Sequence, residues 1–241
     1  MIKFRNLFIN AYWLFHSISR SLLGSVIDER RFRHRDPDDV RSGFSNLTLP
    51  HREWLADRIM MGLNANQGEP LHLVEVGCGW GPNLAVLARR EPSLRLTGVD
   101  ISPASILEGR KRLTELGFNE ITLVEMQGDD LSSFANASAD VVFTDAMLLY
   151  VGPDKIKRVV REMLRVARSR LVMLEMHDQG ESYKGRYTRD GWLRNYAALI
   201  NSLIDGGAVR LEKLPPSLRT AGRWPKYGTL IEIDLTKKEK T

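Results

Sequence analysis

The chain has 241 residues, of which 43% are hydrophobic and 27% charged, a composition typical of a globular protein and not of a disordered one. This length suits one large α/β domain with an appendage and is too short for two such domains. The single cysteine, Cys78, excludes an internal disulfide and a multi-cysteine metal cluster, and it favours a reducing compartment. The sequence therefore predicts a cytoplasmic protein.

The positive charge of the chain is concentrated at its amino terminus. The formal net charge is +5, and residues 1–35 contribute all of it, because they hold seven Lys or Arg side chains against Asp28 and Glu29. The rest of the chain is neutral overall and has no basic stripe interleaved with aromatic residues. Nucleic acid is therefore not expected as a partner.

The same amino-terminal segment has the pattern of an amphipathic helix. At helical spacing its apolar side chains form one stripe, made of Phe4, Leu7, Phe8, Ala11, Leu14, Phe15, Ile18 and Leu22. Three uses of this stripe remain open: peripheral contact with an anionic membrane through residues 1–35, a lid over the following domain, and a homodimer interface. We divide the chain into a basic extension, residues 1–50, and an α/β domain, residues 51–236.

From Leu71 onward, short apolar runs alternate with longer amphipathic ones, as a parallel sheet with crossover helices requires. Strands are predicted over 71–76, 94–99, 121–125, 139–143, 171–176, 209–214 and 229–235. Helices are predicted to begin at Pro82, Pro103 and Pro153, because proline is tolerated in the first turn. A further helix is predicted to carry Trp192, Tyr196, Leu199, Ile200 and Leu203 on one face.

The most informative stretch is Glu75-Val76-Gly77-Cys78-Gly79-Trp80-Gly81, which links the first predicted strand to the first helix. Glycines at such a turn let the backbone approach a ligand closely, with the amide groups of the helix facing it. The dinucleotide pattern G-x-G-x-x-G is excluded, because Pro82 occupies the third glycine position. The G-x-G-x-G spacing after an acidic residue resembles the first motif of class I S-adenosylmethionine-dependent methyltransferases.

Three later segments resemble motifs of the same family in the family's order. Asp100 ends the second strand in Gly98-Val99-Asp100-Ile101-Ser102, and Gln127-Gly128-Asp129-Asp130-Leu131 follows the third. The fourth strand reads Asp140-Val141-Val142-Phe143-Thr144-Asp145. The resemblance covers residues 70–178, and an ordered series of motifs is far more specific than any single one.

The resemblance implies an α/β fold: a seven-stranded, mostly parallel Rossmann-like sheet with helices on both faces, plus the amino-terminal helical extension. It also implies the cofactor S-adenosylmethionine. Asp100 would bond both ribose hydroxyls, an acidic side chain at 129–130 would meet the adenine amino group, and Trp80 would lie beside the methionine end. The expected cofactor-binding residues are Glu75, Gly77, Cys78, Gly79, Trp80, Gly81, Asn83, Asp100, Ile101, Ser102, Asp129, Asp130 and Thr144.

Two candidate catalytic residues follow the fourth and fifth strands, where acceptors lie in open α/β sheets. His177, beside Asp178, has the side-chain type whose pKa suits a general base at neutral pH, and Asp145 is the second candidate. A magnesium site would need a third converging carboxylate, so no metal is expected.

The acceptor class is narrowed by the loop after the fourth strand. This loop reads Thr144-Asp145-Ala146-Met147 and lacks the Pro-Pro-aromatic clamp of enzymes that methylate nucleic-acid bases. Nucleic-acid bases are therefore not expected as acceptors. In overall layout the chain resembles methyltransferases that modify sugars or polyketide-like acceptors. We expect transfer to a small-molecule or glycan acceptor, on oxygen, in polysaccharide or secondary-metabolite biosynthesis. The alternatives are an N- or C-methyltransferase of a small metabolite and a module that binds S-adenosylmethionine without catalysis.

Overall fold

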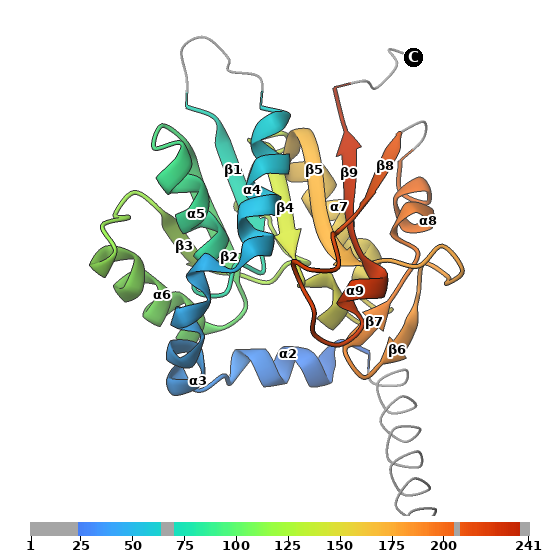
Figure 1. Cartoon of the computed structure of the whole chain (residues 1–241). Helices are drawn as coiled ribbons and strands as arrows, with labels where there is room; N and C mark the ends of the chain where they lie inside the picture. Colours follow the sequence, from blue (N-terminus) through green and yellow to red (C-terminus); the bar gives the residue numbers. More distant parts are fainter. Residues whose placement is uncertain (1–23, 64–69, 205–207, 237–241) are drawn as a thin grey trace, which may run out of the picture.

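A computed structural model describes residues 24–63, 70–204 and 208–236 (Figure 1). The predicted apolar stripe, from Phe4 to Leu22, lies outside the described residues. Among the described residues, no helix is long and apolar enough to cross a bilayer.

Seven strands form one sheet in the order β3-β2-β1-β4-β5-β9-β8. Their bounds are β1 His72–Val76, β2 Arg95–Asp100, β3 Thr122–Glu125, β4 Ala139–Asp145, β5 Ala167–Met176, β8 Val209–Lys213 and β9 Gly228–Asp234. Strands β1 to β5 pair in parallel, and only β9 runs antiparallel to its neighbours β5 and β8. The predicted seven-stranded, mostly parallel sheet is confirmed.

Helices cover both faces of the sheet, which explains why the central strands β1 and β4 are almost continuously buried. The helices α4 (Pro50–Met61), α5 (Pro82–Arg90) and α6 (Pro103–Glu115) contribute to one hydrophobic cluster, and α7 (Ile156–Val166) and α8 (Tyr196–Asn201) to the other. The carboxyl ends of the parallel strands therefore meet at one edge between the two helical layers. In such folds this edge is where ligands bind.

One predicted helix begins later than expected. Trp192 lies in a short hairpin of β6 (Arg186–Thr188) and β7 (Gly191–Leu193), and α8 begins only at Tyr196. The side chain of Asn195 caps this helix by accepting from the amide of Ala198, at 2.9 Å. Gly191 has a φ of 120°, a conformation that side chains rarely adopt, and it places the hairpin turn where apolar periodicity alone suggested a continuous helix.

The described part of the amino-terminal extension crosses the carboxyl edge of the sheet. It forms α2 (Val26–Arg33), α3 (Pro37–Ser42) and a 3₁₀ helix, η1 (Gly43–Thr48), before α4 (Figure 1). Ser25 anchors its start: the amide and hydroxyl of Ser25 donate to Asp154 Oδ1 at 2.9 and 3.0 Å, and the Ser25 hydroxyl accepts from the Gly152 amide at 2.8 Å. Helix α2 is thereby held over the strand ends.

Candidate cofactor and acceptor site

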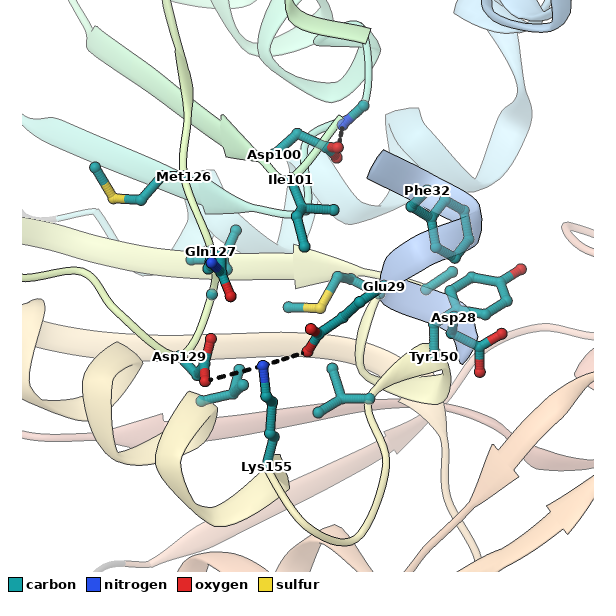
Figure 2. Close-up of a pocket in the computed structure, with 18 of the residues that line it drawn as sticks. Asp28, Glu29, Phe32, Asp100, Ile101, Met126, Gln127, Asp129, Tyr150 and Lys155 are labelled. Carbon is teal, nitrogen blue, oxygen red and sulfur yellow. Dashed lines mark hydrogen bonds and ion pairs between the residues drawn. The ribbon is translucent and has the colours of Figure 1, made fainter. Parts of the chain in front are cut away.

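A cavity lies at the carboxyl edge of the sheet, directly beneath α2. Its volume is about 210 Å³. The turn after β1, the end of β2, the segment after β3 and the turn after β4 form its walls. Helix α2 closes it with Asp28, Glu29 and Phe32 (Figure 2). A concave site at this edge of an open α/β sheet is where small organic ligands bind.

The glycine turn forms one wall of this cavity. Gly77, Gly79 and Gly81 have φ values of 77°, 55° and 89°, so all three adopt the left-handed conformation that favours glycine. The amides of Gly77 and Cys78 donate to the carbonyl of Val99 at 2.8 and 3.0 Å, which holds the turn against β2. A Cβ atom added to Gly79 would meet no protein atom within 4 Å, so the turn leaves open space at this point.

Asp100, at the end of β2, presents a fixed carboxylate beside the glycine turn (Figure 2). Its Oδ2 accepts from the Gly79 amide at 2.8 Å, and its Oδ1 accepts from the Ser102 amide at 2.9 Å. Burial raises the pKa of Asp100, and these amide donors act against that rise by favouring the charged form. Each oxygen keeps a lone pair for a hydroxyl of a bound ligand.

A bridge of charges joins α2 to the segment after β3. Lys155 Nζ lies 2.6 Å from Glu29 Oε1 on α2 and 3.4 Å from Asp129 Oδ2 (Figure 2). Asp129 also pairs with Arg158, so its carboxylate is shared between two cations. The ring of Phe32 on α2 packs edge-on against Tyr150, with the ring centroids 4.8 Å apart. Helix α2 is therefore tied to the cavity by both charge and packing.

A second polar group is buried beside the cavity, at the end of β4. Arg219 Nη2 lies 3.0 Å from Asp145 Oδ1, and Arg52 Nη1 lies 3.9 Å from Asp145 Oδ2. Asn83 Nδ2 donates to Glu75 Oε1 at 2.6 Å and to Asp145 Oδ2 at 3.3 Å. Burial acts to raise the pKa of Asp145, but the charge of Arg219 and its other neighbours hold that pKa well below its usual range. Asp145 is therefore ionised.

Two further groups of this polar cluster are neutral at pH 7. His51 Nε2 lies 2.6 Å from Arg219 Nη2 and 3.4 Å from Asp145 Oδ2. Because an arginine can only donate, the shorter contact favours the tautomer of His51 with its ring proton on Nδ1. Burial lowers the pKa of His51 and keeps it uncharged. Burial raises the pKa of Glu75 to about 8, so its carboxyl group holds its proton near pH 7.

His177 lies just beyond the end of β5, in a different hollow from the cavity. Its Nδ1 accepts from the Tyr196 amide at 3.1 Å, so the ring proton lies on Nε2. The hollow is shared with Lys213 and Tyr227, among others. Burial, together with the charge of Lys213, lowers the pKa of His177 to about 4.

Residues 73–170 match the model of a protein family described as a methyltransferase domain. A methyltransferase domain is therefore identified over these residues. Trans-aconitate 2-methyltransferase of Delftia acidovorans is 29% identical over 149 residues, which cover 60% of this chain and 51% of that protein. The chain thus matches about half the length of this relative.

Solved structures share the fold of the methyltransferase domain. An O-methyltransferase family protein from Burkholderia thailandensis has a TM-score of 0.62 and 19% identity, over 85% of this chain and 61% of that one. Geranyl diphosphate C-methyltransferase from Streptomyces coelicolor, in complex with S-adenosyl-L-homocysteine, has a TM-score of 0.56 and 18% identity, over 74% of each chain.

S-adenosylmethionine is the cofactor of this domain, and the residues present in the cavity fit it. Asp100 offers paired carboxylate oxygens for two ribose hydroxyls, and Ile101 and Met126 offer apolar surface for a purine ring. The open space at Gly79 lets a ligand lie directly on the backbone. Phosphate-binding cations are not needed for a nucleoside of this kind.

Five predicted cofactor residues line the cavity of the methyltransferase domain: Gly77, Gly79, Asp100, Ile101 and Asp129. The other predicted residues lie around it: Glu75, Cys78, Trp80, Gly81, Asn83, Ser102, Asp130 and Thr144. For both groups, the assignment to the cofactor stays a prediction.

These surrounding residues support the cavity in several ways. Ser102 caps α6 by accepting from the Ser105 amide at 3.1 Å, and Thr144 donates to Glu175 Oε1 at 3.2 Å. Trp80 packs on Phe44 of the 3₁₀ helix η1, with 5.1 Å between the ring centroids. Cys78 is buried, and burial raises the pKa of its thiol well above the usual value. Asp130 is exposed.

The residues that sequence reasoning missed come from distant segments. Phe32 and Glu29 belong to α2, which was seen only as part of a basic segment, and Lys155 precedes α7. His51 and Arg219 are 168 positions apart in the chain. No local motif marks these residues, because their role depends on which loops fold over the strand ends.

Proposed function

We propose that the protein transfers the methyl group of S-adenosylmethionine to a small-molecule acceptor. The observation that carries this proposal is the cavity in which the open glycine turn faces the fixed carboxylate of Asp100. The test is S-adenosylhomocysteine formation by the purified protein with a panel of acceptors. The panel includes trans-aconitate and geranyl diphosphate, because similar proteins are named for them, and it also includes sugars and glycans.

The cofactor supplies an already activated methyl group, so the protein has mainly to align the acceptor and to exclude water. Asp100 and the turn at Gly79 hold the nucleoside end. The side chain of Met147 packs directly on Gly77, so a Cβ atom added to Gly77 would overlap it. Met147 therefore forms the wall between the cofactor and the end of β4. Helix α2 covers the reacting groups from solvent.

Oxygen is the acceptor atom that we propose, with nitrogen and carbon as the alternatives. A module that binds S-adenosylmethionine without catalysis would bind both forms of the cofactor and yield no S-adenosylhomocysteine with any acceptor. Product analysis by mass spectrometry and by hydrolysis separates O-, N- and C-methyl products. Only O-methyl esters release methanol under mild alkali.

His177→Ala tests the predicted general base. Loss of a general base lowers turnover by about 10²–10⁴-fold and leaves cofactor affinity intact. In the structure, however, His177 Nδ1 already accepts from an amide, and its ring lies outside the cavity lining. We therefore expect turnover to fall by less than about 10-fold, with calorimetry showing unchanged S-adenosylhomocysteine affinity. A fall in the full general-base range would instead assign His177 to the acceptor site.

We also propose that residues 1–23 contact an anionic membrane surface. The apolar stripe offers area to bury, and Lys3, Arg5 and Arg20 add attraction of roughly 1 kcal/mol each. The full chain should co-sediment with phosphatidylserine vesicles at low salt and less at high salt, whereas a 24–241 variant that keeps α2 should not. If the full chain stays in the supernatant at low salt, the proposed membrane contact is wrong, and the apolar stripe serves as a lid or as a dimer interface.

Sedimentation velocity without lipid tests the homodimer alternative.

A further inference from the structure

The polar cluster at the end of β4 holds two arginines around one ionised carboxylate. Arg52 and Arg219 are both cations, because an arginine stays charged in proteins. Asp145 is ionised, whereas His51 is neutral and Glu75 holds its proton. A buried guanidinium is stable only where each of its donors has a partner, so a donor left over in this cluster indicates where an anion would bind.

Arg219 is the member of the cluster whose side chain is best placed to bind an anion. Its guanidinium stacks on the Trp224 indole, with 4.1 Å between Cζ and the ring centroid. This stacking fixes the plane of the guanidinium and its donors. Its Nη2 is engaged by His51 and Asp145, but its Nη1 is buried and has no hydrogen-bond partner among the described residues. A buried donor without an acceptor is unfavourable, and a bound anion would satisfy it.

The cluster lies next to the cofactor cavity. Ala146 directly follows Asp145 and lines the cavity, with a φ of 57° that is strained for a residue with a side chain. Burial raises the pKa of Tyr150, another lining residue, and the charge of Arg219 is among the influences that lower it. The cluster therefore adjoins the wall of the cavity.

Neither predicted base is available to remove a proton from an acceptor. Asp145 is paired with Arg219, and a carboxylate with a depressed pKa is a poor base. His177 carries its proton on Nε2, and its ring faces the hollow shared with Lys213. An acceptor that is already ionised at neutral pH needs no base.

We infer that the acceptor is a carboxylic acid, bound through the guanidinium of Arg219 and methylated on a carboxylate oxygen. This inference rests on the proposed methyl transfer. A lone pair of the carboxylate oxygen forms the new bond to the methyl carbon, and the bond between that carbon and sulfur breaks with its electron pair remaining on sulfur. The products are a neutral methyl ester and S-adenosylhomocysteine, and no proton is released.

The first test offers the full-length protein mono-, di- and tricarboxylic acids together with their matched primary amides and alcohols. We expect S-adenosylhomocysteine to form with at least one acid and with neither of its matched analogues. The product should release methanol in mild alkali, as a methyl ester does. Turnover with alcohols or amines but with no acid would overturn the inference and leave the proposed function standing. Cofactor binding without turnover on any compound would contradict both.

The second test changes Arg219. Arg219→Met should raise the KM for the acid by about 10- to 100-fold, as expected for loss of a charge-assisted hydrogen bond, and Arg219→Lys by less. The matched control is Arg223→Met on the same loop, whose partner is Asp190 at 3.7 Å. Thermal unfolding of each variant establishes that it is folded. Equal KM values in folded Arg219→Met and wild type would overturn the inference.

The bound carboxylate has two chemical sources, the acceptor and the methionine end of the cofactor. Calorimetry with S-adenosylhomocysteine and with 5′-methylthioadenosine, which lacks that carboxylate, separates them. We expect both affinities to be unchanged in Arg219→Met. Weaker binding of S-adenosylhomocysteine alone would assign Arg219 to the cofactor and overturn its role with the acceptor.

Discussion

Gly79→Val should abolish measurable binding of S-adenosylhomocysteine by the folded protein. The added side chain would project into space that no protein atom occupies within 4 Å of its Cβ, so it would fill the volume left for the ligand. The φ of 55° at Gly79 also strains any larger residue, and this strain is of order 1–2 kcal/mol. Isothermal titration calorimetry measures the affinity.

Gly117→Val is the matched control for this variant. Gly117 also has a positive φ, 83°, and an added Cβ there also meets nothing within 4 Å, but it follows α6 and lies outside the cavity lining. The control should lose similar stability and keep wild-type affinity.

Asp100→Asn is a second test of the same site. The loss of a charge-assisted bond pair to ribose hydroxyls should weaken binding of S-adenosylhomocysteine by about 10- to 100-fold. Unchanged affinity in both Gly79→Val and Asp100→Asn would refute the site.

Removal of residues 1–35 should lower the affinity for S-adenosylhomocysteine by at least about 100-fold and leave the α/β sheet folded. The deletion takes away one wall of the cavity, including Phe32 and the Glu29 partner of Lys155. Burial of one aromatic side chain and the covered ligand surface is worth several kcal/mol. Calorimetry measures the affinity, and circular dichroism and thermal unfolding measure the fold.

A deletion that stops before α2 is the control for this experiment. The 24–241 variant keeps Ser25 and its bonds to Asp154 and Gly152, so it should bind S-adenosylhomocysteine like the full chain. Phe32→Ala provides a milder test within the intact chain, and it should weaken binding because the ring packs on Tyr150. A 36–241 protein with wild-type affinity would show that α2 is not part of the cofactor site.

The sheet and the cofactor turn could be predicted because their information is local. Apolar runs of strand length, broken by amphipathic stretches, are enough to indicate a parallel sheet with crossover helices. The glycine turn and Asp100 each end a predicted strand, and parallel strands bring their carboxyl ends to one edge. Trp192 shows the limit of such reasoning. Its spacing from Tyr196 suits a helix, yet the turn at Gly191 places it in β7.

The amino-acid sequence by itself predicted the fold class and the glycine turn after the first strand, because neighbouring positions encode both. The cofactor was indicated by the resemblance of the ordered motifs to a known family. Only the tertiary structure decided what surrounds the cofactor. It placed α2 over the cavity and turned the ring of His177 toward another hollow. It also brought Arg219 from the loop after β8 to Asp145 at the end of β4. Contacts between segments so far apart in the chain depend on how the loops pack. The periodicity or motif of one segment does not indicate which distant side chain will pair with a charged residue in it.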